Sequence, residues 1–213
     1  KNLIRYEETM KKTNLVILLT AGYLLCQIIA DVTASKMVGL FGIYVPAAVF
    51  IYALTFTLRD VVHKQLGKQQ AVFMVLTAGV VNVLMAAYFM FTVWLKPAPF
   101  WGNQEAYNLI LGVVPRVVGA SILAEMVSEL IDTEVYHRIK HLAPWKRVLG
   151  SNAVSLPIDS LIFVSVAFAG TMPVAALISV MLGQVLLKAV ITVISIPLIY
   201  VIPDKPLTPE LID

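Results

Sequence analysis

The residues that could do chemistry are charged side chains inside otherwise apolar stretches of the second half of the chain. Arg116, Glu125, Glu129, Asp159 and Lys188 each stand among aliphatic and small residues. An ionisable group within a bilayer costs about 2.5–3.5 kcal/mol on insertion scales, so such groups are expected to face the interior of a helix bundle and to pair. Two cations and three carboxylates can therefore fix helix register or bind a polar small molecule.

Helical spacing places three of the acidic residues on one face. Glu125, Glu129 and Asp132 follow the pattern i, i+4, i+7. Arg116 lies about half a turn away from Glu125, at roughly 100° per residue, so it cannot simply pair with that face. Its partner is expected on another helix.

Depth in the membrane decides between two partners for Arg116. Counted from the expected helix ends, Arg116 and Asp159 lie at comparable depth near the membrane middle, whereas Asp31 lies towards the outer side. Asp159 is therefore the favoured partner. Asp31 itself can be a substrate contact or a cap at the outer end of its helix.

Polar stripes on neighbouring stretches extend the pattern. Asn152, Ser155 and Asp159 share a helix face with Phe163, and Gln184, Lys188 and Thr192 share another. These faces predict a central cavity with both charge signs, amide groups and aromatic rings. Its candidate binding residues are Asp31, Tyr52, Phe56, Asn82, Arg116, Glu125, Asp159, Phe163, Gln184 and Lys188.

A structural interpretation of the same residues stays open. An Arg116–Asp159 pair, and a pair of Lys188 with Glu125 or Glu129, would be neutral buried pairs that fix the packing of the helices. Asn82 and Gln184 could equally join helices by hydrogen bonds.

The elements that must carry these residues are membrane-spanning helices. The chain has 213 residues, of which 59% are hydrophobic and 14% charged, with a mean hydropathy of +0.85. A bilayer is crossed by about 17–25 apolar residues in a helix. We predict an all-α, polytopic membrane protein with one domain, 1–213, and six spans at about 13–35, 42–60, 70–95, 107–134, 147–169 and 172–202.

The basic residues indicate the orientation of these spans. Lys and Arg gather in the N-terminal segment, in the second loop with Arg59, Lys64 and Lys68, in the fourth loop and in the C-terminal tail, whereas the first and third loops hold only Lys36 and Lys96. Cytoplasmic loops carry the excess of Lys and Arg, so both termini are expected in the cytoplasm. An excess of three positive charges distributed in this way does not indicate nucleic-acid binding.

Catalytic and metal-binding patterns find little support. The single cysteine, Cys26, cannot form an intrachain disulfide, and thiolates cannot build a metal site. His63, His137 and His141 fall at expected cytoplasmic ends, and there is neither a zinc-protease motif nor a phosphate-binding loop. We therefore expect no enzyme activity, no cofactor and no metal.

The order and spacing of several short blocks resemble the vitamin uptake transporter family, in particular its queuosine precursor transporters. The resemblance runs from about Asp31 to Tyr200. It rests on Thr55-Phe56-Thr57-Leu58-Arg59-Asp60 with Gly67-Lys68, on Pro115-Arg116 with Ala120-Ser121 and Leu130-Ile131-Asp132, on Ser155 to Asp159 with Phe163 and Ala167-Phe168, and on Lys188 with Pro197.

The resemblance implies import of 7-cyano-7-deazaguanine or 7-aminomethyl-7-deazaguanine across the cytoplasmic (inner) membrane of a bacterium or archaeon, for salvage into the tRNA nucleoside queuosine. A guanine-like ring offers N–H donors, a carbonyl acceptor and a flat face. The expected donor-edge contacts are Asp159 or Glu125, the acceptor-edge contacts Arg116, Lys188, Asn82 or Gln184, and the stacking residues Phe56, Tyr52 or Phe163.

Two points about partners remain open at this stage. The alternative function is a substrate-binding membrane subunit that depends on a separate ATP-driven complex, as in modular vitamin importers. A homodimer is plausible for a chain with six spans.

Overall fold

The computed structural model describes residues 2–201, and this part of the chain is mostly helical. Seven helices and one two-stranded sheet follow in the order α1 (Asn2–Thr33), β1 (Met37–Leu40), β2 (Ile43–Pro46), α2 (Val49–Leu66), α3 (Lys68–Trp94), α4 (Gln104–Leu111), α5 (Val114–Arg138), α6 (Pro144–Phe168) and α7 (Val174–Val201).

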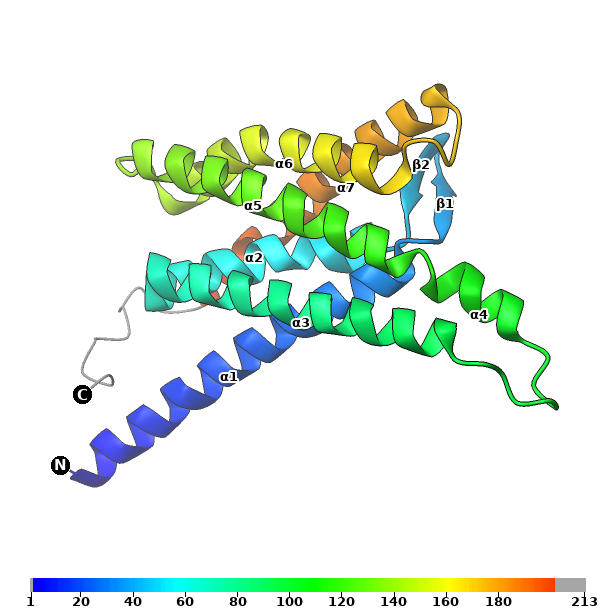
Figure 1. Cartoon of the computed structure of the whole chain (residues 1–213). Helices are drawn as coiled ribbons and strands as arrows, with labels where there is room; N and C mark the ends of the chain where they lie inside the picture. The colour runs from blue at the N-terminus through cyan, green and yellow to red at the C-terminus, as the bar shows by residue number, and fades with distance from the viewer. Residues whose placement is uncertain (1, 202–213) are drawn as a thin grey trace.

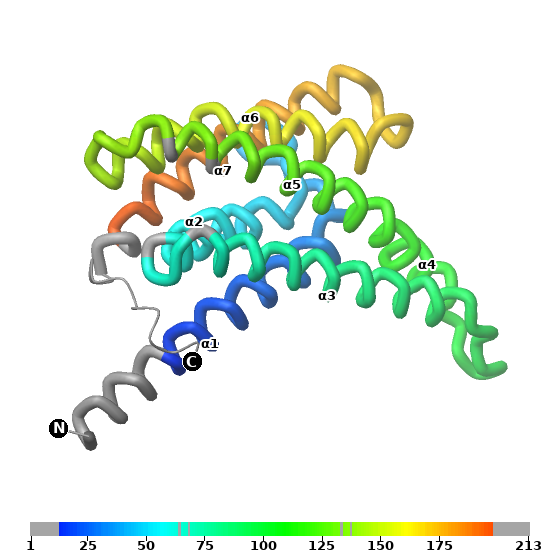
Figure 2. The backbone as a smooth tube through the Cα atoms, turned by 60° about the vertical axis from the view of Figure 1, so that its left-hand side comes forward, coloured from blue at the N-terminus to red at the C-terminus, as the bar shows by residue number. Residues whose placement is uncertain are grey.

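The long helices run back and forth between two ends of the molecule. The hairpin, the α3–α4 connection and the α6–α7 turn lie at one end, and the α2–α3 and α5–α6 turns lie at the other (Figure 1). Helix α2 packs against α1, α3 and α7, and α5 runs along α6. Figure 2 shows α2 between the α1–α3 side and the α6–α7 side of the bundle.

Five helical segments are long and apolar enough to cross a membrane: Thr13–Thr33, Gln69–Trp94, Gln104–Tyr136, Pro144–Phe168 and Val174–Pro197. Helix α2 has 18 residues and carries Arg59, Asp60 and Lys64, and it is not among these five segments. The structure therefore supports a polytopic helical membrane protein. A sixth span and cytoplasmic termini stay predictions.

The expected second span, 42–60, is wrong at its beginning, and the fold is not purely helical. Residues Met37–Leu40 and Ile43–Pro46 pair as an antiparallel hairpin, and α2 begins only at Val49. The turn needs positive φ angles, which Phe41 (49°) and Gly42 (86°) adopt. A glycine in the turn and a proline at the end of a strand suit a hairpin and not the start of a span.

The expected fourth span, 107–134, lies within the candidate span Gln104–Tyr136, but it contains a break between two helices. Helix α4 ends at Leu111, and α5 begins at Val114. Pro115, in the first turn of α5, has no N–H to donate to the carbonyl of Leu111, which favours a break in the helix at this point. Pro157 lies inside α6 and Pro197 inside α7.

Apolar packing holds the two sides of the bundle together. Tyr23, Val62 and Ala78 belong to a buried cluster of α1, α2 and α3 that also includes Val148 of α6. Ala120, Val164 and Val180 belong to another, formed by α5, α6 and α7. Large apolar side chains cover the outer faces of the helices, which suits contact with lipid.

Candidate substrate site

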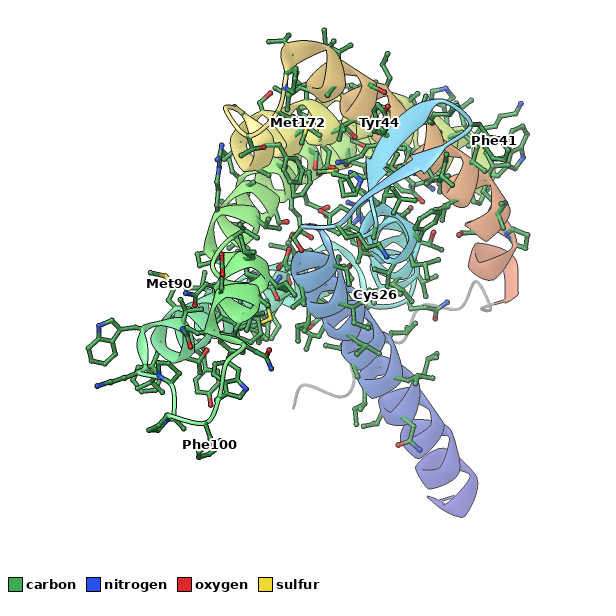
Figure 3. The ribbon with its side chains drawn as sticks, turned by 90° about the vertical axis from the view of Figure 1, so that its right-hand side faces the viewer. Cys26, Phe41, Tyr44, Met90, Phe100 and Met172 are labelled. Atoms are coloured by element: carbon green, nitrogen blue, oxygen red, sulfur yellow. The ribbon has the colours of Figure 1, made fainter. Side chains whose placement is uncertain are left out.

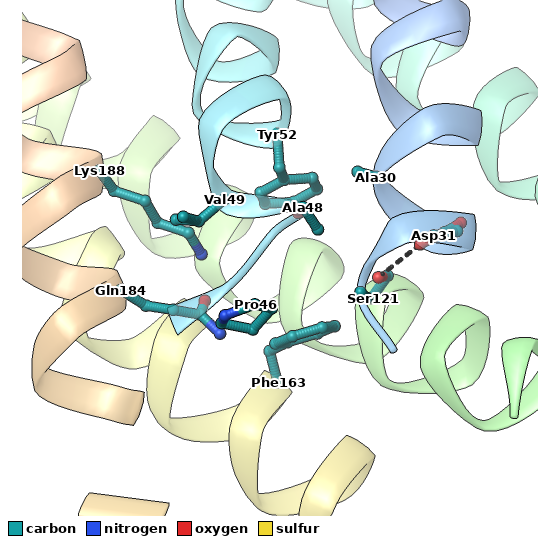
Figure 4. A pocket seen from close by; sticks show the side chains of 11 residues that line it. Ala30, Asp31, Pro46, Ala48, Val49, Tyr52, Ser121, Phe163, Gln184 and Lys188 are labelled. Carbon is teal, nitrogen blue, oxygen red and sulfur yellow. Dashed lines mark hydrogen bonds between the residues drawn. The ribbon is translucent and has the colours of Figure 1, made fainter. Parts of the chain in front are cut away.

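A cavity lies where α1, α2, α5, α6 and α7 meet beneath the hairpin. Figure 4 shows Lys188 and Gln184 reaching into it from α7, with Asp31 of α1 on the far side. Small residues leave this space because they bring short side chains to the helix contacts. The lining consists of Ala30, Asp31, Ala34, Pro46, Ala48, Val49, Tyr52, Ser121, Phe163, Gln184 and Lys188.

Lys188 is the cation of the cavity, and it is 1% exposed. Its Nζ donates to Asp159 Oδ2 at 2.5 Å, and Ser128 Oγ donates to Asp159 Oδ1 at 3.3 Å. Nζ also lies 4.9 Å from the centroid of the Tyr52 ring. Because an ammonium has three N–H donors, the ion pair leaves Lys188 able to donate into the cavity.

Asp31 offers an open acceptor on the opposite side. Ser121 Oγ donates to Asp31 Oδ1 at 2.9 Å. Asp31 Oδ2 is buried and has no hydrogen-bond partner among the described residues. A buried polar atom without a partner costs about 1–3 kcal/mol, and more when it is charged, so this oxygen is poised for a donor from a ligand or a water molecule.

Gln184 adds an open donor of the same kind. Its Nε2 is buried and lacks a partner in the described part of the chain. It lies one turn before Lys188 on α7. The cavity therefore presents two donors from one helix and one acceptor from another.

Two aromatic rings border the cavity on opposite sides in Figure 4, Tyr52 from α2 and Phe163 from α6. Both pack against the same alanine-rich cluster, which includes Ala30 and Ala48. Rings on two sides of a polar space suit a flat heterocycle, whose face can stack while its edge forms hydrogen bonds.

The hairpin covers one end of this cavity. Its Pro46 belongs to the lining, and Tyr44 donates its backbone N–H to Ser179 Oγ at 3.3 Å. A Cβ on Gly183 would lie 2.6 Å from the carbonyl oxygen of Tyr44. Glycine is required at position 183 because the hairpin rests directly on α7, as the position of Tyr44 in Figure 3 illustrates.

The cavity is nearly closed in this arrangement. It leaves about 20 Å³ for the centres of water-sized molecules, which is room for about one water molecule. A bicyclic base is several times larger, so binding requires the lining elements to move apart.

Comparison with known proteins identifies the family. The family model described as "Putative vitamin uptake transporter" matches residues 46–202. The chain belongs to the vitamin uptake transporter family. A relative from Bacillus subtilis (strain 168), named "Probable queuosine precursor transporter", is 32% identical over 177 residues, which are 80% of this chain and 77% of the relative. No solved structure matches.

Membership makes the chain a membrane transporter and not an enzyme, which agrees with the sequence prediction. Among the described residues, no group of three or more His, Cys, Asp or Glu side chains could hold a metal ion. Cys26 is a buried free thiol of α1.

Most of the predicted site residues of this vitamin uptake transporter come together. Asp31, Tyr52, Phe163, Gln184 and Lys188 line the cavity. Two further predicted residues adjoin it: Asp159 holds Lys188, and the ring of Phe56 packs edge to face on Tyr52 at 5.6 Å between centroids. Asn82 of α3 lies outside this lining, and its buried Oδ1 has no partner in the region that the structure describes.

The predicted Arg116–Asp159 pair is wrong. Arg116 donates from Nε to the carbonyl of Val166 at 2.8 Å and from a terminal nitrogen to that of Ala169 at 2.6 Å. Arg116 begins α5 beside the end of α6, whose last carbonyls have no partner within their own helix. It therefore caps α6 and lies outside the cavity lining.

The alternative pairing of Lys188 with Glu125 or Glu129 is also wrong. Glu125 accepts from the hydroxyl of Tyr23 and from Gln27 Nε2, the latter at 2.8 Å. Glu129 pairs with Arg59. The predicted substrate-binding residue Glu125 is thus engaged by α1, away from the cavity lining.

Arg59 is the largest departure from the sequence analysis, which counted it among the cytoplasmic loop charges. It is 4% exposed and binds Glu129, Asp132 at 3.0 Å and Asp60 at 3.1 Å. Ser155 Oγ donates to Asp132 Oδ1 at 2.9 Å. We call Arg59 with Asp60, Glu129 and Asp132 the Arg59 cluster.

Sequence reasoning missed Tyr23 and Gln27 of α1 and the contact made by Ser121 of α5, which position the polar groups. Tyr23, Gln27 and Asp31 recur every four residues and so share one face of α1. This spacing of polar residues on one helix face could have indicated from the sequence that all three point into the bundle. The contact of Ser121 with Asp31 had no such signal, because it joins two helices that are far apart in the sequence.

Proposed function

We propose that this transporter imports queuosine precursors, 7-cyano-7-deazaguanine or 7-aminomethyl-7-deazaguanine, across the cytoplasmic membrane of a bacterium or archaeon for tRNA queuosine salvage. One observation carries the proposal: a small cavity between two aromatic rings holds a carboxylate oxygen opposite an amide nitrogen and a lysine, and neither the oxygen nor the amide nitrogen has a hydrogen-bond partner among the described residues. The name of the Bacillus subtilis relative points to the same substrate class.

The hydrogen-bonding pattern of a guanine-like base fits these groups. Its ring N–H and exocyclic amino group donate, and Asp31 Oδ2 accepts. Its carbonyl oxygen accepts, and Lys188 Nζ and Gln184 Nε2 donate. The flat rings of Tyr52 and Phe163 supply stacking surfaces.

The charge of the cavity suits a substrate without a phosphate. Asp159 neutralises Lys188 at 2.5 Å, and Asp31 adds a further carboxylate to the lining. A phosphorylated nucleotide would bring several negative charges beside Asp31 and meet a cation that is already paired. A free base avoids this repulsion.

Ligand-induced thermal stabilisation of the purified protein tests the proposal. The two deazaguanines should raise the melting temperature, and adenine should not. Adenine has an amino donor where guanine has its carbonyl acceptor, and a ring nitrogen acceptor where guanine has its N–H donor. The Asp31→Asn variant should lose most of the shift, because it replaces one acceptor oxygen by a donor. Equal stabilisation by adenine would contradict the proposed base recognition.

Reconstitution separates this function from that of a subunit of an ATP-driven importer. The purified chain alone, in liposomes loaded with unlabelled deazaguanine, should exchange it for radiolabelled deazaguanine outside. Strict dependence of this exchange on added ATPase subunits would instead identify a binding subunit.

A further inference from the structure

A second polar site lies along the contact between α6 and α7. Asn152 of α6 and Thr192 of α7 are each 3% exposed. Both amide atoms of Asn152 and the hydroxyl of Thr192 lack a hydrogen-bond partner among the residues described. Both residues border a groove that leaves about 250 Å³ for the centres of water-sized molecules.

Pro157 leaves a backbone acceptor without its helical donor beside this groove. Proline has no N–H, so the carbonyl of Ala153, four residues earlier in α6, loses its donor within the helix. Ala153 and Pro157 both line the groove. Together with Asn152 and Thr192, they place donors and acceptors in otherwise apolar surroundings, where an unmet polar atom is costly.

The groove continues the polar faces of the central cavity. Gln184, Lys188 and Thr192 are spaced by four residues on α7, so Thr192 lies about 6 Å along the helix from Lys188. On α6, Asn152 precedes Asp159 by seven residues and shares its face. Both steps lead towards the end where α5 turns into α6 (Figure 1), which the basic residues place in the cytoplasm.

We infer that Asn152 and Thr192 form a second binding site, which the transported base occupies between the central cavity and the cytoplasmic end. This inference rests on the proposed function. The site takes an uncharged heterocycle, because its polar atoms are an amide, a hydroxyl and a carbonyl without a formal charge.

Other occupants fit the groove less well. The unpartnered atoms of Asn152 are buried within the chain, so neither a lipid nor a second copy of the chain can reach them while α6 and α7 stay together. Lipid tails also offer no hydrogen bonds. A small polar molecule that arrives from the central cavity as the helices separate can reach these atoms and can form hydrogen bonds with them.

Transport and binding measurements on two variants test this site. Asn152→Leu and Thr192→Val remove the polar atoms with little change in volume. Each should slow exchange in proteoliposomes by about three- to tenfold, the loss expected for one hydrogen bond, while the thermal shift by deazaguanine at the central cavity stays unchanged. Thr77→Val is the matched control, because the Thr77 hydroxyl already donates to the carbonyl of Phe73 at 2.8 Å.

Exchange at the rate of the unmodified protein in both variants would overturn the inference. If Asn152→Leu fails to fold, Thr192→Val decides, since it loses a single hydroxyl. A loss of the central thermal shift equal to the loss of exchange would also overturn it, because the residues would then serve the first site.

Thiol labelling gives a readout that does not depend on the substrate. In a Cys26→Ala background, which has no other cysteine, Thr192→Cys should react with a membrane-impermeant methanethiosulfonate added from the cytoplasmic side. Leu186→Cys, at a residue of α7 that is 59% exposed on the outer face, should not react, because lipid excludes the reagent.

Labelling also separates the failure of the inference from that of the proposed function. If the unmodified protein binds no deazaguanine, the proposed function fails, yet reaction at Thr192→Cys still supports a polar route along α6 and α7. Absence of reaction at Thr192→Cys, or reaction only with a lipid-soluble maleimide, would overturn the route and leave the central site intact.

Discussion

Two buried groups of charges lie near each other in this bundle and differ in how far their hydrogen-bonding capacity is used. In the Arg59 cluster, one guanidinium contacts three carboxylates, and Ser155 supports Asp132. In the central cavity, Lys188 and Asp159 form a pair, but Asp31 Oδ2 and Gln184 Nε2 have no partner among the described residues.

The difference distinguishes the structural role of the Arg59 cluster from the ligand-binding role proposed for the central cavity. A buried cluster whose members bind one another holds helices together, and it has little to offer a ligand. A cavity that retains an open acceptor and an open donor is unfavourable when empty, and it gains free energy when a complementary molecule fills it. Buried charge by itself therefore identifies neither role.

Loss of Arg59 should have the largest effect on folding. Arg59→Gln leaves three carboxylates without their cation, and breaking a buried pair costs about 3–5 kcal/mol. We expect a much lower melting temperature and a poor yield of purified protein. Arg138→Gln is the control, because its pair with Glu134 has side chains that are 74% and 59% exposed and contributes about 0.3–0.5 kcal/mol. Equal melting temperatures for the two variants would remove the structural role of the Arg59 cluster.

The Lys188–Asp159 pair should separate stability from binding. Lys188→Met or Asp159→Asn alone leaves one buried charge, so each should destabilise the fold by about 3–5 kcal/mol. The double variant removes both charges and should recover much of the stability. Deazaguanine affinity should nevertheless stay about 10- to 150-fold lower in the double variant, the range for hydrogen bonds to a charged group.

Titration of the double variant with deazaguanine checks this expectation. Recovery of both stability and affinity would assign the pair to helix packing and contradict a role in substrate binding.

Asp31 should affect binding more than stability. Asp31→Asn preserves the shape of the side chain and replaces the open acceptor by a donor, so deazaguanine affinity should fall about tenfold or more. Ser121→Ala removes only the hydrogen bond that Ser121 donates to Asp31 Oδ1, so it should lower deazaguanine affinity by less. Isothermal titration measures both values. A larger loss with Ser121→Ala would indicate that Asp31 acts mainly through helix packing.

Arg116 should have the smallest effect on binding. Arg116→Gln weakens the cap on the last carbonyls of α6 and should cost about 1 kcal/mol of stability. The thermal shift by deazaguanine should stay unchanged, because Arg116 lies outside the cavity lining. Loss of the thermal shift by deazaguanine would instead indicate that Arg116 belongs to the substrate site.

The sequence could predict most residues of the candidate site because burial in a membrane constrains polar side chains strongly. Asp31, Gln184 and Lys188 interrupt apolar helices, and the cost of exposing them to lipid directs them inward. The same argument brought Asp159 to the centre and placed aromatic residues such as Tyr52 nearby. It could not separate Arg116 from this group, because a guanidinium can also be satisfied by the end of a neighbouring helix.

Pairing was beyond the reach of the sequence. Helical periodicity gives the face on which a side chain lies, but not the distance between faces of helices that are far apart in the chain. Arg59 was therefore taken for a loop charge, although it sits in a buried cluster. The hairpin was hidden within an apolar stretch, because four-residue strands leave little periodicity to read.

The sequence by itself determined that this protein lies in a membrane, that it is helical and which family it belongs to. The hydrophobic content and the lengths of the apolar stretches determined the first two, and the blocks shared with vitamin uptake transporters determined the third. What only the tertiary structure decided is which buried polar atoms bind one another and which stay open. Hydrophobicity and periodicity are properties of each segment by itself. Whether a polar atom finds a hydrogen-bond partner depends instead on the distance between donor and acceptor on different segments, where a few tenths of an ångström decide.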